Sequence, residues 1–287
     1  MAINMEPGPT GIEVRKKESV IEVEGTDVHY VQAGQGQDLV MVSGLLASSR
    51  AFDFVLDPFA KNFRTIAVDL PGFGVSGRHL MERRYSPGEH AKTVVGLMDK
   101  LGIKQTGLIG DSYGCAVAMV AATDYPDRIS YLVLQGPPKF DFLKKITKFP
   151  EHVSIRLAKD IRGAKGLAFW FRRLNPEFMN MTQEQLINAD NRLSAVSARA
   201  GIQAGFDVVN FDFAVCATKL TVPTLIIEGN NPVALAVSSA RIIKESAVEG
   251  LVTINRFNGS HTLLQQRPND FVEAVVDFKK KVEGAVG

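Results

Sequence analysis

Cysteine is scarce in this chain, and long apolar runs are missing. Only Cys115 and Cys216 occur among 287 residues, which excludes a disulfide framework and predicts a reducing, cytoplasmic location. No run of about 18 apolar residues, the length needed to span a bilayer, occurs in the sequence. The first residues hold no apolar segment typical of a signal peptide. The net charge of +2 is too small to indicate nucleic-acid binding. We therefore expect a chain that binds neither nucleic acid nor membranes.

Neither an internal repeat nor a low-complexity segment occurs. Short β-rich runs instead alternate with helical patterns, which predicts an α/β fold with a mostly parallel sheet flanked by helices. Two runs with period-two alternation, 19–24 and 27–33, are separated by Gly25-Thr26 and predict a hairpin at the leading edge of the sheet. Further strands are expected at 38–43, 64–70, 105–111, 129–136, 222–229 and 251–257, and helices at 50–61, 87–102, 113–124 and 268–283.

The stretch 138–220 breaks this alternation, because its helical patterns are not separated by strands. We interpret it as a helical lid inserted into one α/β core, which consists of 1–137 and 221–287. Such an insertion is expected to lie over the carboxyl edge of the sheet.

The first part of the lid is both basic and aromatic. Residues 138–173 carry ten cations and only three anions, which predicts a solvated basic face. The alternative interpretations are a surface for an acidic carrier protein, for an anionic substrate or for a membrane. Phe140, Trp170 and Phe178 are candidates for lining an apolar substrate pocket, and equally for docking the lid onto the core.

One motif points to nucleophilic catalysis. Gly110-Asp111-Ser112-Tyr113-Gly114 has the form G-x-S-x-G and stands between an expected strand and an expected helix. The chemistry needs glycines on both sides because the backbone must turn sharply to expose the serine hydroxyl. The helix that follows directs its amides at the same place and favours negative charge there. We expect Asp111 to cap this helix or to support the site.

On these residues the chain resembles the α/β-hydrolase superfamily. Residues 28–77 are similar to the opening hairpin, oxyanion loop and D-x-x-G-x-G-x-S turn of that family, in which Asp69 begins the turn. Residues 258–278 are similar to its terminal histidine loop and last helix. The order of serine, acid position and histidine is also that of the family.

The resemblance implies a role for several residues. Ser112 would be the nucleophile, and His261 would take its proton and return it to the leaving group. The backbone amides of Leu45 and Tyr113 would bind the oxyanion. Ser43-Gly44 replaces the His-Gly pair that usually begins the oxyanion loop, but the donors are backbone amides. His29 and His90 stand in no such setting, and we interpret them as structural or solvated.

The resemblance fails at the acid, which with the serine and the histidine makes up the catalytic triad of the family. The usual position falls on Asn231 and the alternative position on Gln135. An amide can orient an imidazole, but it cannot stabilise the imidazolium by charge. Either the Asn231 amide itself orients His261, or a carboxylate from elsewhere in the chain does. Glu228, Asp207 and Asp212 are the candidates.

These residues leave three functions open. The first is a serine-dependent hydrolase of a carboxylic ester, lactone or thioester of a small molecule. The second is a lyase, eliminase, cyclase or decarboxylase, in which His261 removes a proton beside a carbonyl and the oxyanion site holds an enolate. The third is a ligand-binding receptor without turnover. The Cys and His residues lack metal-ligand spacing and no phosphate-binding loop occurs, so we expect no metal and no organic cofactor.

Overall fold

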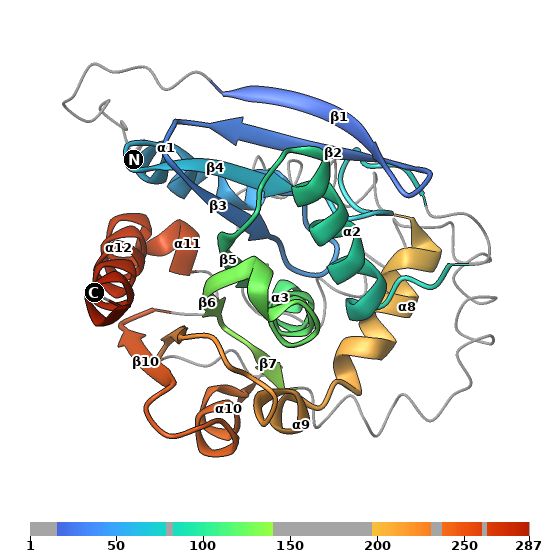
Figure 1. Ribbon diagram of the computed structural model, residues 1–287. Coiled ribbons are helices and arrows are strands. Elements are labelled where there is room, and N and C mark those ends of the chain that lie inside the picture. The colour runs from blue at the N-terminus through green and yellow to red at the C-terminus, as the bar shows by residue number, and fades with distance from the viewer. Residues whose placement is uncertain (1–15, 79–82, 140–196, 231–236, 260–262, 287) are drawn as a thin grey trace, which may run out of the picture.

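The computed structural model of the protein describes residues 16–78, 83–139, 197–230, 237–259 and 263–286. Figure 1 shows this part as a sheet with helices on both faces. Five of the predicted site residues lie outside the described ranges: Phe140, Trp170, Phe178, Asn231 and His261.

Eight strands form the central sheet in the order β1-β2-β4-β3-β5-β6-β8-β10. Their bounds are Lys17–Val23 (β1), Thr26–Ala33 (β2), Gln37–Val42 (β3), Phe63–Val68 (β4), Thr106–Asp111 (β5), Ile129–Gln135 (β6), Thr224–Gly229 (β8) and Val252–Phe257 (β10). The β1–β2 and β2–β4 pairs are antiparallel, and every pair from β4 to β10 is parallel. This confirms the predicted fold class, with the hairpin at the leading edge.

Helices cover both faces of the sheet (Figure 1). One face carries α1 (Asp53–Ala60), α11 (Leu263–Gln266) and α12 (Pro268–Val286), and the other carries α2 (Pro87–Lys100), α3 (Tyr113–Asp124), α8 (Ala198–Val209), α9 (Phe213–Ala217) and α10 (Ala240–Ser246). Two short 3-10 helices, η1 (Ser49–Phe52) and η2 (Pro126–Arg128), join these elements. Among the described residues, no helix has both the length and the apolar character that crossing a bilayer requires.

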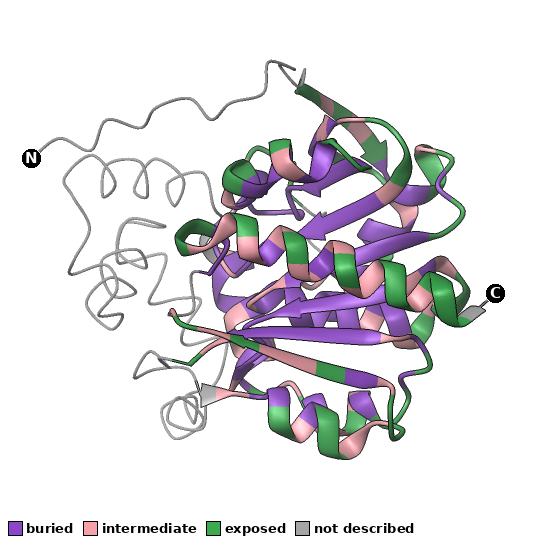
Figure 2. Cartoon of the chain, turned by 90° about the vertical axis from the view of Figure 1, so that its left-hand side faces the viewer, coloured by how far each residue is buried: buried purple, intermediate pink, exposed green. Residues whose placement is uncertain are grey.

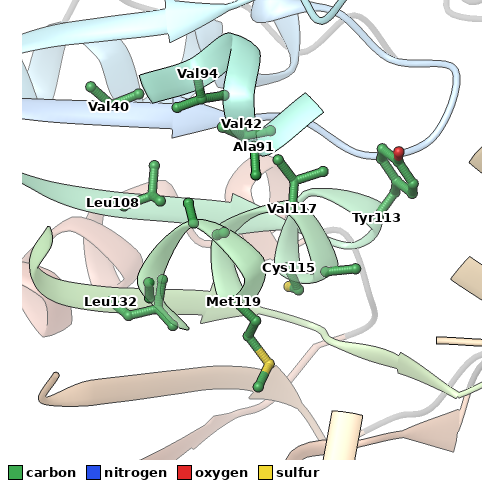
Figure 3. Packing of buried hydrophobic residues seen from close by; sticks show 14 of the residues in the cluster. Val40, Val42, Ala91, Val94, Leu108, Tyr113, Cys115, Val117, Met119 and Leu132 are labelled. Atoms are coloured by element: carbon green, nitrogen blue, oxygen red, sulfur yellow. The ribbon is translucent and has the colours of Figure 1, made fainter. Parts of the chain in front are cut away.

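Two apolar cores result, one on each side of the sheet. The central strands are buried along nearly their whole length, whereas the outward faces of the helices are exposed (Figure 2). Because both faces are covered, these strands are continuous apolar runs rather than alternating ones. Figure 3 shows side chains that pack between the strands and helix α3. They belong to one of these cores and include Val40, Val42, Leu108, Leu132, Val117 and Met119. Each such side chain contributes about 1.5–3 kcal/mol relative to an exposed one.

A second, two-stranded sheet was not predicted. β7 (Pro138–Lys139) pairs antiparallel with β9 (Val237–Ser238), so the expectation of a stretch 138–220 without strands is wrong at its first residues. Two residues are too few to show a period, and Pro138 disfavours a strand assignment. The Ser239 hydroxyl donates to the Pro138 carbonyl at 3.0 Å and fixes this junction.

Candidate active site

The predicted nucleophile lies at a sharp turn between β5 and α3. Ser112 has φ 52° and ψ −111°, a conformation that costs a non-glycine residue about 1–3 kcal/mol. The surrounding backbone holds it there. The Ser112 N–H donates to the Gln135 carbonyl at 2.9 Å, and the Cys115 N–H donates to the Ser112 carbonyl at 2.9 Å. The described chain thus forms the strand–turn–helix geometry that the G-x-S-x-G spacing predicts.

Two glycines make this turn possible because no side chain fits at either position. A Cβ on Gly110 would lie 2.4 Å from the Gly114 carbonyl oxygen, and a Cβ on Gly114 would lie 2.2 Å from the Val42 carbonyl oxygen. Both obstacles are backbone atoms, which cannot rotate away. The missing side chains therefore let β3, β5 and α3 meet closely and place Ser112 at the carboxyl edge of the sheet.

The loop that follows β3 lies against the nucleophile. Gly44 is so close to it that a Cβ on this glycine would lie 3.3 Å from the Ser112 Cβ. The loop then turns back on itself: the Ala47 N–H donates to the Gly44 carbonyl at 3.2 Å, and Leu46 adopts a positive φ of 62°. This is the loop that the resemblance assigns to oxyanion binding.

The two predicted oxyanion donors are the backbone amides of Leu45 and Tyr113, and both lack an acceptor in the described part of the chain. Within the described ranges, neither the Leu45 N–H nor the Tyr113 N–H donates a hydrogen bond. Tyr113 is the first residue of α3, where the amide has no acceptor within the helix and the helix dipole favours negative charge. Two unused donors next to a serine hydroxyl are the arrangement that stabilises an oxyanion.

The side chain of Tyr113 fixes its backbone in place. Its hydroxyl is 2.7 Å from Nδ1 of His90, and Nε2 of His90 is 3.2 Å from the Pro71 carbonyl oxygen. A carbonyl only accepts, so Nε2 carries the proton and Nδ1 accepts from the tyrosine hydroxyl. Burial raises the pKa of Tyr113 well above its ordinary value, which keeps the hydroxyl protonated. His90 is fully buried and is therefore structural, as predicted.

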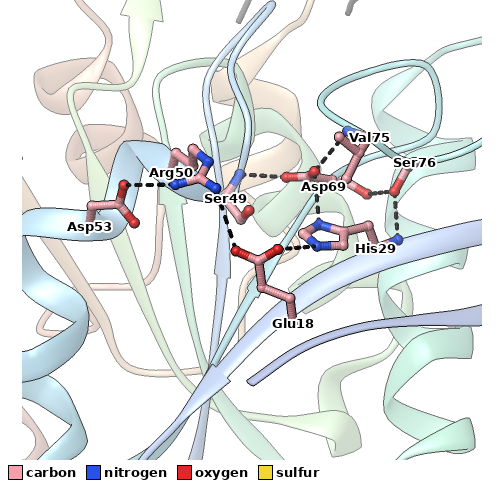
Figure 4. A network of polar contacts seen from close by, with 8 residues as sticks. All are labelled: Glu18, His29, Ser49, Arg50, Asp53, Asp69, Val75 and Ser76. Atoms are coloured by element: carbon pink, nitrogen blue, oxygen red, sulfur yellow. Dashed lines mark hydrogen bonds and ion pairs between the residues drawn. The ribbon is translucent and has the colours of Figure 1, made fainter. Parts of the chain in front are cut away.

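Asp69 fastens the far end of the oxyanion loop (Figure 4). Its buried carboxylate accepts from the Ser49 N–H at 2.5 Å, from the Val75 N–H at 2.9 Å and from His29 Nδ1 at 3.0 Å. Ser49 begins η1 directly after the loop. Glu18 lies 3.7 Å from the other ring nitrogen of His29. The network joins the loop to the turn after β4, which explains the need for an acid at the start of that turn.

Asp111 supports the site rather than capping the helix. Ser112 is the N-cap residue of α3, and no side chain caps that end. The carboxyl group of Asp111 instead lies against the oxyanion loop, where a Cβ on Gly44 would lie 3.4 Å from Asp111 Oδ2. Desolvation raises the pKa of Asp111 to about 7, and the nearby Gly44 amide partly offsets this rise. The contact between Asp111 and the loop after β3 was not predicted. In the sequence, only the position of Asp111 beside Ser112 pointed to it.

Glu228, one of the alternative acids, lies near the carboxyl end of β8, three residues before the usual acid position at Asn231. The residue is 7% exposed, and its Oε1 accepts from Nε of Arg256 at 2.7 Å. Its Oε2 is buried and has no hydrogen-bond partner among the described residues. The parallel pairing sets Glu228 beside Arg256, on the strand that leads to His261. One carboxylate oxygen thus remains available near the start of the histidine loop.

An amide at the end of β8 organises that same region. The Asn230 N–H donates to the Phe257 carbonyl at 2.9 Å, and the Gly259 N–H donates to Asn230 Oδ1 at 3.4 Å. Asn230 therefore ties the end of β8 to the segment that follows β10. In the sequence, only the presence of two neighbouring asparagines signals this role.

The two other candidate acids have structural partners. Asp207 accepts a bidentate hydrogen bond from Arg84, at 2.6 and 3.0 Å. Asp212 is the N-cap of α9 and accepts from the Val215 N–H at 3.0 Å. Among the residues with described positions, no group of three or more His, Cys, Asp or Glu side chains is arranged to hold a metal ion.

Helix α8 forms a wall beside the oxyanion loop. A Cβ on Gly205 would lie 3.6 Å from Cδ2 of Leu45. The Ser197 N–H donates to the Gly72 carbonyl at 2.9 Å just before the helix begins, and Gln203 Oε1 accepts from the Tyr85 N–H at 3.2 Å. The end of the predicted lid is thus bonded directly to the core next to the site.

Comparisons with known proteins agree with this geometry. A family model described as alpha/beta hydrolase fold matches residues 39–174. A 2-hydroxy-6-oxononadienedioate/2-hydroxy-6-oxononatrienedioate hydrolase from a Pseudomonas species is 31% identical over 230 residues, which cover 73% of this chain and 76% of that protein.

Solved structures share the same architecture. A hydrolase from Pseudomonas aeruginosa PA01 is similar with a TM-score of 0.77 at 20% identity, over 91% of this chain and 97% of that one. The enol-lactonase from Burkholderia xenovorans LB400 is similar with a TM-score of 0.75 at 20% identity, over 91% of this chain and 100% of that one. At these identities the likeness is one of fold.

Proposed function

Because this chain belongs to the α/β-hydrolase family, we propose that it is a serine-dependent hydrolase that cleaves a carboxylic ester, lactone or thioester of a small molecule. The observation that carries the proposal is the strained backbone of Ser112, held beside the amides of Leu45 and Tyr113, which have no acceptor in the part of the chain that the structure describes. Ser112 attacks the carbonyl carbon, and the two amides donate to the oxygen as it becomes negative. His261 takes the serine proton and returns it to the leaving group.

Glu228 is the residue that we propose to orient His261. Its second oxygen is buried without a partner among the described residues, and β10, its neighbour in the sheet, leads toward the histidine. A carboxylate stabilises the imidazolium that forms when His261 takes the proton, which Asn231 cannot do by charge. Replacing the aspartate of a serine-protease triad by asparagine costs about four decades of rate because the amide holds the imidazole in the wrong tautomer, so a carboxylate is needed at this position.

Replacing Glu228 tests this assignment. Glu228→Gln keeps the shape and removes the charge, so we expect kcat to fall at least about tenfold on a p-nitrophenyl ester with little change in KM. A carboxylate raises the pKa of a nearby imidazole, so its loss shifts the acid limb of the pH–rate profile to lower pH. The added change Asn231→Asp supplies a new carboxylate and is expected to restore part of the rate. An unchanged rate and acid limb in Glu228→Gln would exclude Glu228 from this role.

Hydrolysis of a carbon–carbon bond is the second candidate. The name of the Pseudomonas relative describes an unsaturated hydroxy-keto diacid, which contains a ketone and no ester. The same attack by Ser112 and the same oxyanion amides serve a ketone, but the leaving group is then a carbon that must be protonated. Product analysis with an ester and with such a keto acid separates the two candidates. The relatives reported above are hydrolases, and they give no support to the lyase and cyclase alternatives.

The site and composition also bear on location and partners. We place the protein in the cytoplasm on its two unpaired cysteines, of which Cys115 is buried. The substrate is a small molecule, as the name of the Pseudomonas relative indicates for that protein. An acidic carrier protein that meets the basic stretch 138–173 stays a prediction, because nearly all of that stretch lies outside the described residues.

A further inference from the structure

His29 and Asp69 are direct neighbours across two antiparallel strands of the sheet. Tyr30 pairs with Val68 across β2 and β4, so the residue before Tyr30 stands opposite the residue after Val68. The Asp69 N–H donates to the His29 carbonyl at 2.9 Å. The Ser76 hydroxyl joins the same two residues, because it donates to the Asp69 carbonyl at 2.6 Å and accepts the His29 N–H at 2.8 Å. The backbone therefore holds the two side chains next to each other.

The His29 imidazole donates to the Asp69 carboxylate (Figure 4). Nδ1 of His29 lies 3.0 Å from Asp69 Oδ2, and because a carboxylate only accepts, Nδ1 carries the proton. Both side chains are buried, with exposed fractions of 9% and 2%. The two other donors to this carboxylate, the amides of Ser49 and Val75, belong to the backbone. His29 is therefore the part of the network that a substitution can remove while both amides stay.

Gly74 makes room for this carboxylate. A Cβ on Gly74 would lie 2.2 Å from Asp69 Oδ2, so the absence of a side chain lets the two come together. The Val75 N–H donates to the same oxygen at 2.9 Å. Oδ2 thus accepts from both His29 and Val75, which fixes the plane of the carboxylate and directs Oδ1 at the Ser49 amide, 2.5 Å away.

The same carboxylate holds one end of the predicted oxyanion loop. Gly44 lies against Ser112 at the start of the loop, and the Ser49 N–H donates to Asp69 Oδ1 at its end. Between these two points the loop contains Leu45, whose amide has no acceptor in the described part of the chain. A carboxylate that turns away from Ser49 would therefore release one end of the loop and displace this amide.

We propose that His29 is a positioning residue of the oxyanion site: by holding Oδ2 of Asp69, it directs Oδ1 at the Ser49 amide and keeps the oxyanion loop against Ser112. The proposal rests on the proposed function, because the position of this loop affects the rate only if Ser112 attacks a carbonyl. The oxyanion forms after the substrate has bound, so a displaced donor lowers kcat and leaves KM nearly unchanged. Formation and hydrolysis of the acyl-enzyme both pass through an oxyanion, so both steps slow down.

Two substitutions of His29 test the proposal, because their amide nitrogens replace different ring nitrogens. His29→Asn places an NH2 group near the position of Nδ1 and keeps a donor to Asp69, whereas His29→Gln places it near the position of Nε2 and loses that donor. With a p-nitrophenyl ester we expect kcat to fall at least about tenfold in His29→Gln, with KM within about twofold, and to stay within about threefold in His29→Asn. His29→Leu fills the space without a donor; it replaces His29→Gln if that variant does not fold, and is expected to behave like it.

Val23→Ala is the matched control, because it weakens the same hairpin away from the site. Val23 lies in β1 and packs against α2, where a Cβ on Gly96 would lie 2.6 Å from Cγ1 of Val23. The residue is 2% exposed, so its truncation leaves a cavity and destabilises the fold. We expect the urea midpoint to fall in Val23→Ala as it does in His29→Gln, while kcat stays within about twofold of the unchanged protein.

Hydrogen exchange gives a second reading that needs no turnover. Loss of the His29 donor lets the Asp69 carboxylate turn, so the Ser49 N–H loses its acceptor more often. We expect the Ser49 amide to exchange at least about tenfold faster in His29→Gln than in the unchanged protein, and at nearly the unchanged rate in His29→Asn. Equal exchange in all three proteins would show that His29 does not hold this end of the loop and would overturn the proposal.

The kinetic results can also overturn it. A kcat that is unchanged in His29→Gln, or that falls equally in His29→Asn, contradicts the proposal. A similar fall in Val23→Ala does so too, because lost stability would then explain the effect. If a fluorophosphonate modifies Ser112 but His29→Gln keeps its rate, the proposed function stands and only the role of His29 is rejected. If the unchanged protein neither hydrolyses the ester nor reacts at Ser112, the proposed function fails, and the positioning role fails with it.

Discussion

At the residue scale, the candidate site depends on three polar groups that have no hydrogen-bond partner among the described residues, and on two glycines that lack a Cβ atom. The amides of Leu45 and Tyr113 and one oxygen of Glu228 have no hydrogen-bond partner in the described chain. The Cβ atoms that Gly110 and Gly114 lack would collide with backbone carbonyls. The positions of the glycines could be predicted, because the steric demand of a sharp turn is local and leaves a fixed spacing.

The contacts of single side chains could not be predicted in the same way. The Asp111 carboxyl meets an amide from the end of another strand, and the Tyr113 hydroxyl meets His90, which is 23 residues earlier. No periodicity links such positions, because the contacts arise only when strands and helices pack. For the same reason, the sequence does not reveal that Asp207 pairs with Arg84 or that Asp212 caps α9.

The steric role of Gly114 gives a prediction at this scale. Gly114→Ala places a Cβ 2.2 Å from the Val42 carbonyl oxygen, so the end of β3 must move. We expect the free energy of unfolding to fall by about 3 kcal/mol and the modification of Ser112 by a fluorophosphonate to be lost. Urea denaturation measures the first effect. Gly284→Ala is the matched control, because nothing lies within 4 Å of its Cβ position and alanine favours its helix. A stable, reactive Gly114→Ala protein would contradict the steric account.

At the scale of elements, the predicted strands and helices outside the lid agree with the structure to within three residues at each described boundary. Buried parallel strands are apolar without interruption, and that signal is strong in a chain of this length. The β7–β9 pair was missed because two residues carry no period. The attachment of α8 to the core was also missed, since sequence spacing reveals neither the hydrogen bonds of Ser197 and Gln203 to the core nor the bidentate ion pair between Arg84 and Asp207.

That ion pair leads to a prediction about the wall beside the oxyanion loop. Asp207→Asn removes the charge that holds Arg84, so we expect α8 to open more often and to lose about 1 kcal/mol of stability. Hydrogen exchange of the amides in 198–209 measures the opening and is expected to become faster. Glu245→Gln is the control, because it breaks an exposed pair with Arg241 and leaves exchange in α8 unchanged. Equal exchange in Asp207→Asn and the unchanged protein would show that the pair does not anchor the helix.

At the scale of the whole molecule, the fold brings distant segments to one edge of the sheet. The predicted oxyanion loop follows β3, the predicted nucleophile follows β5, and Glu228 is the last residue but one of β8, so the carboxyl ends of parallel strands gather the candidate site. The order of strands and the family resemblance made this predictable. The proposal that Glu228 orients His261 could not be made from the sequence alone, because the usual position holds Asn231 and a carboxylate from elsewhere is recognised only by its burial and partners.

The central claim is that Ser112 is the nucleophile, and covalent modification tests it most directly. A fluorophosphonate incubated with the full chain is expected to add one adduct to Ser112, located by peptide mass spectrometry, and to abolish hydrolysis of a p-nitrophenyl ester in proportion to its addition. Ser112→Ala is expected to show neither the adduct nor the hydrolysis. Hydrolysis that continues in Ser112→Ala, or in a protein whose Ser112 stays unmodified, would contradict the account.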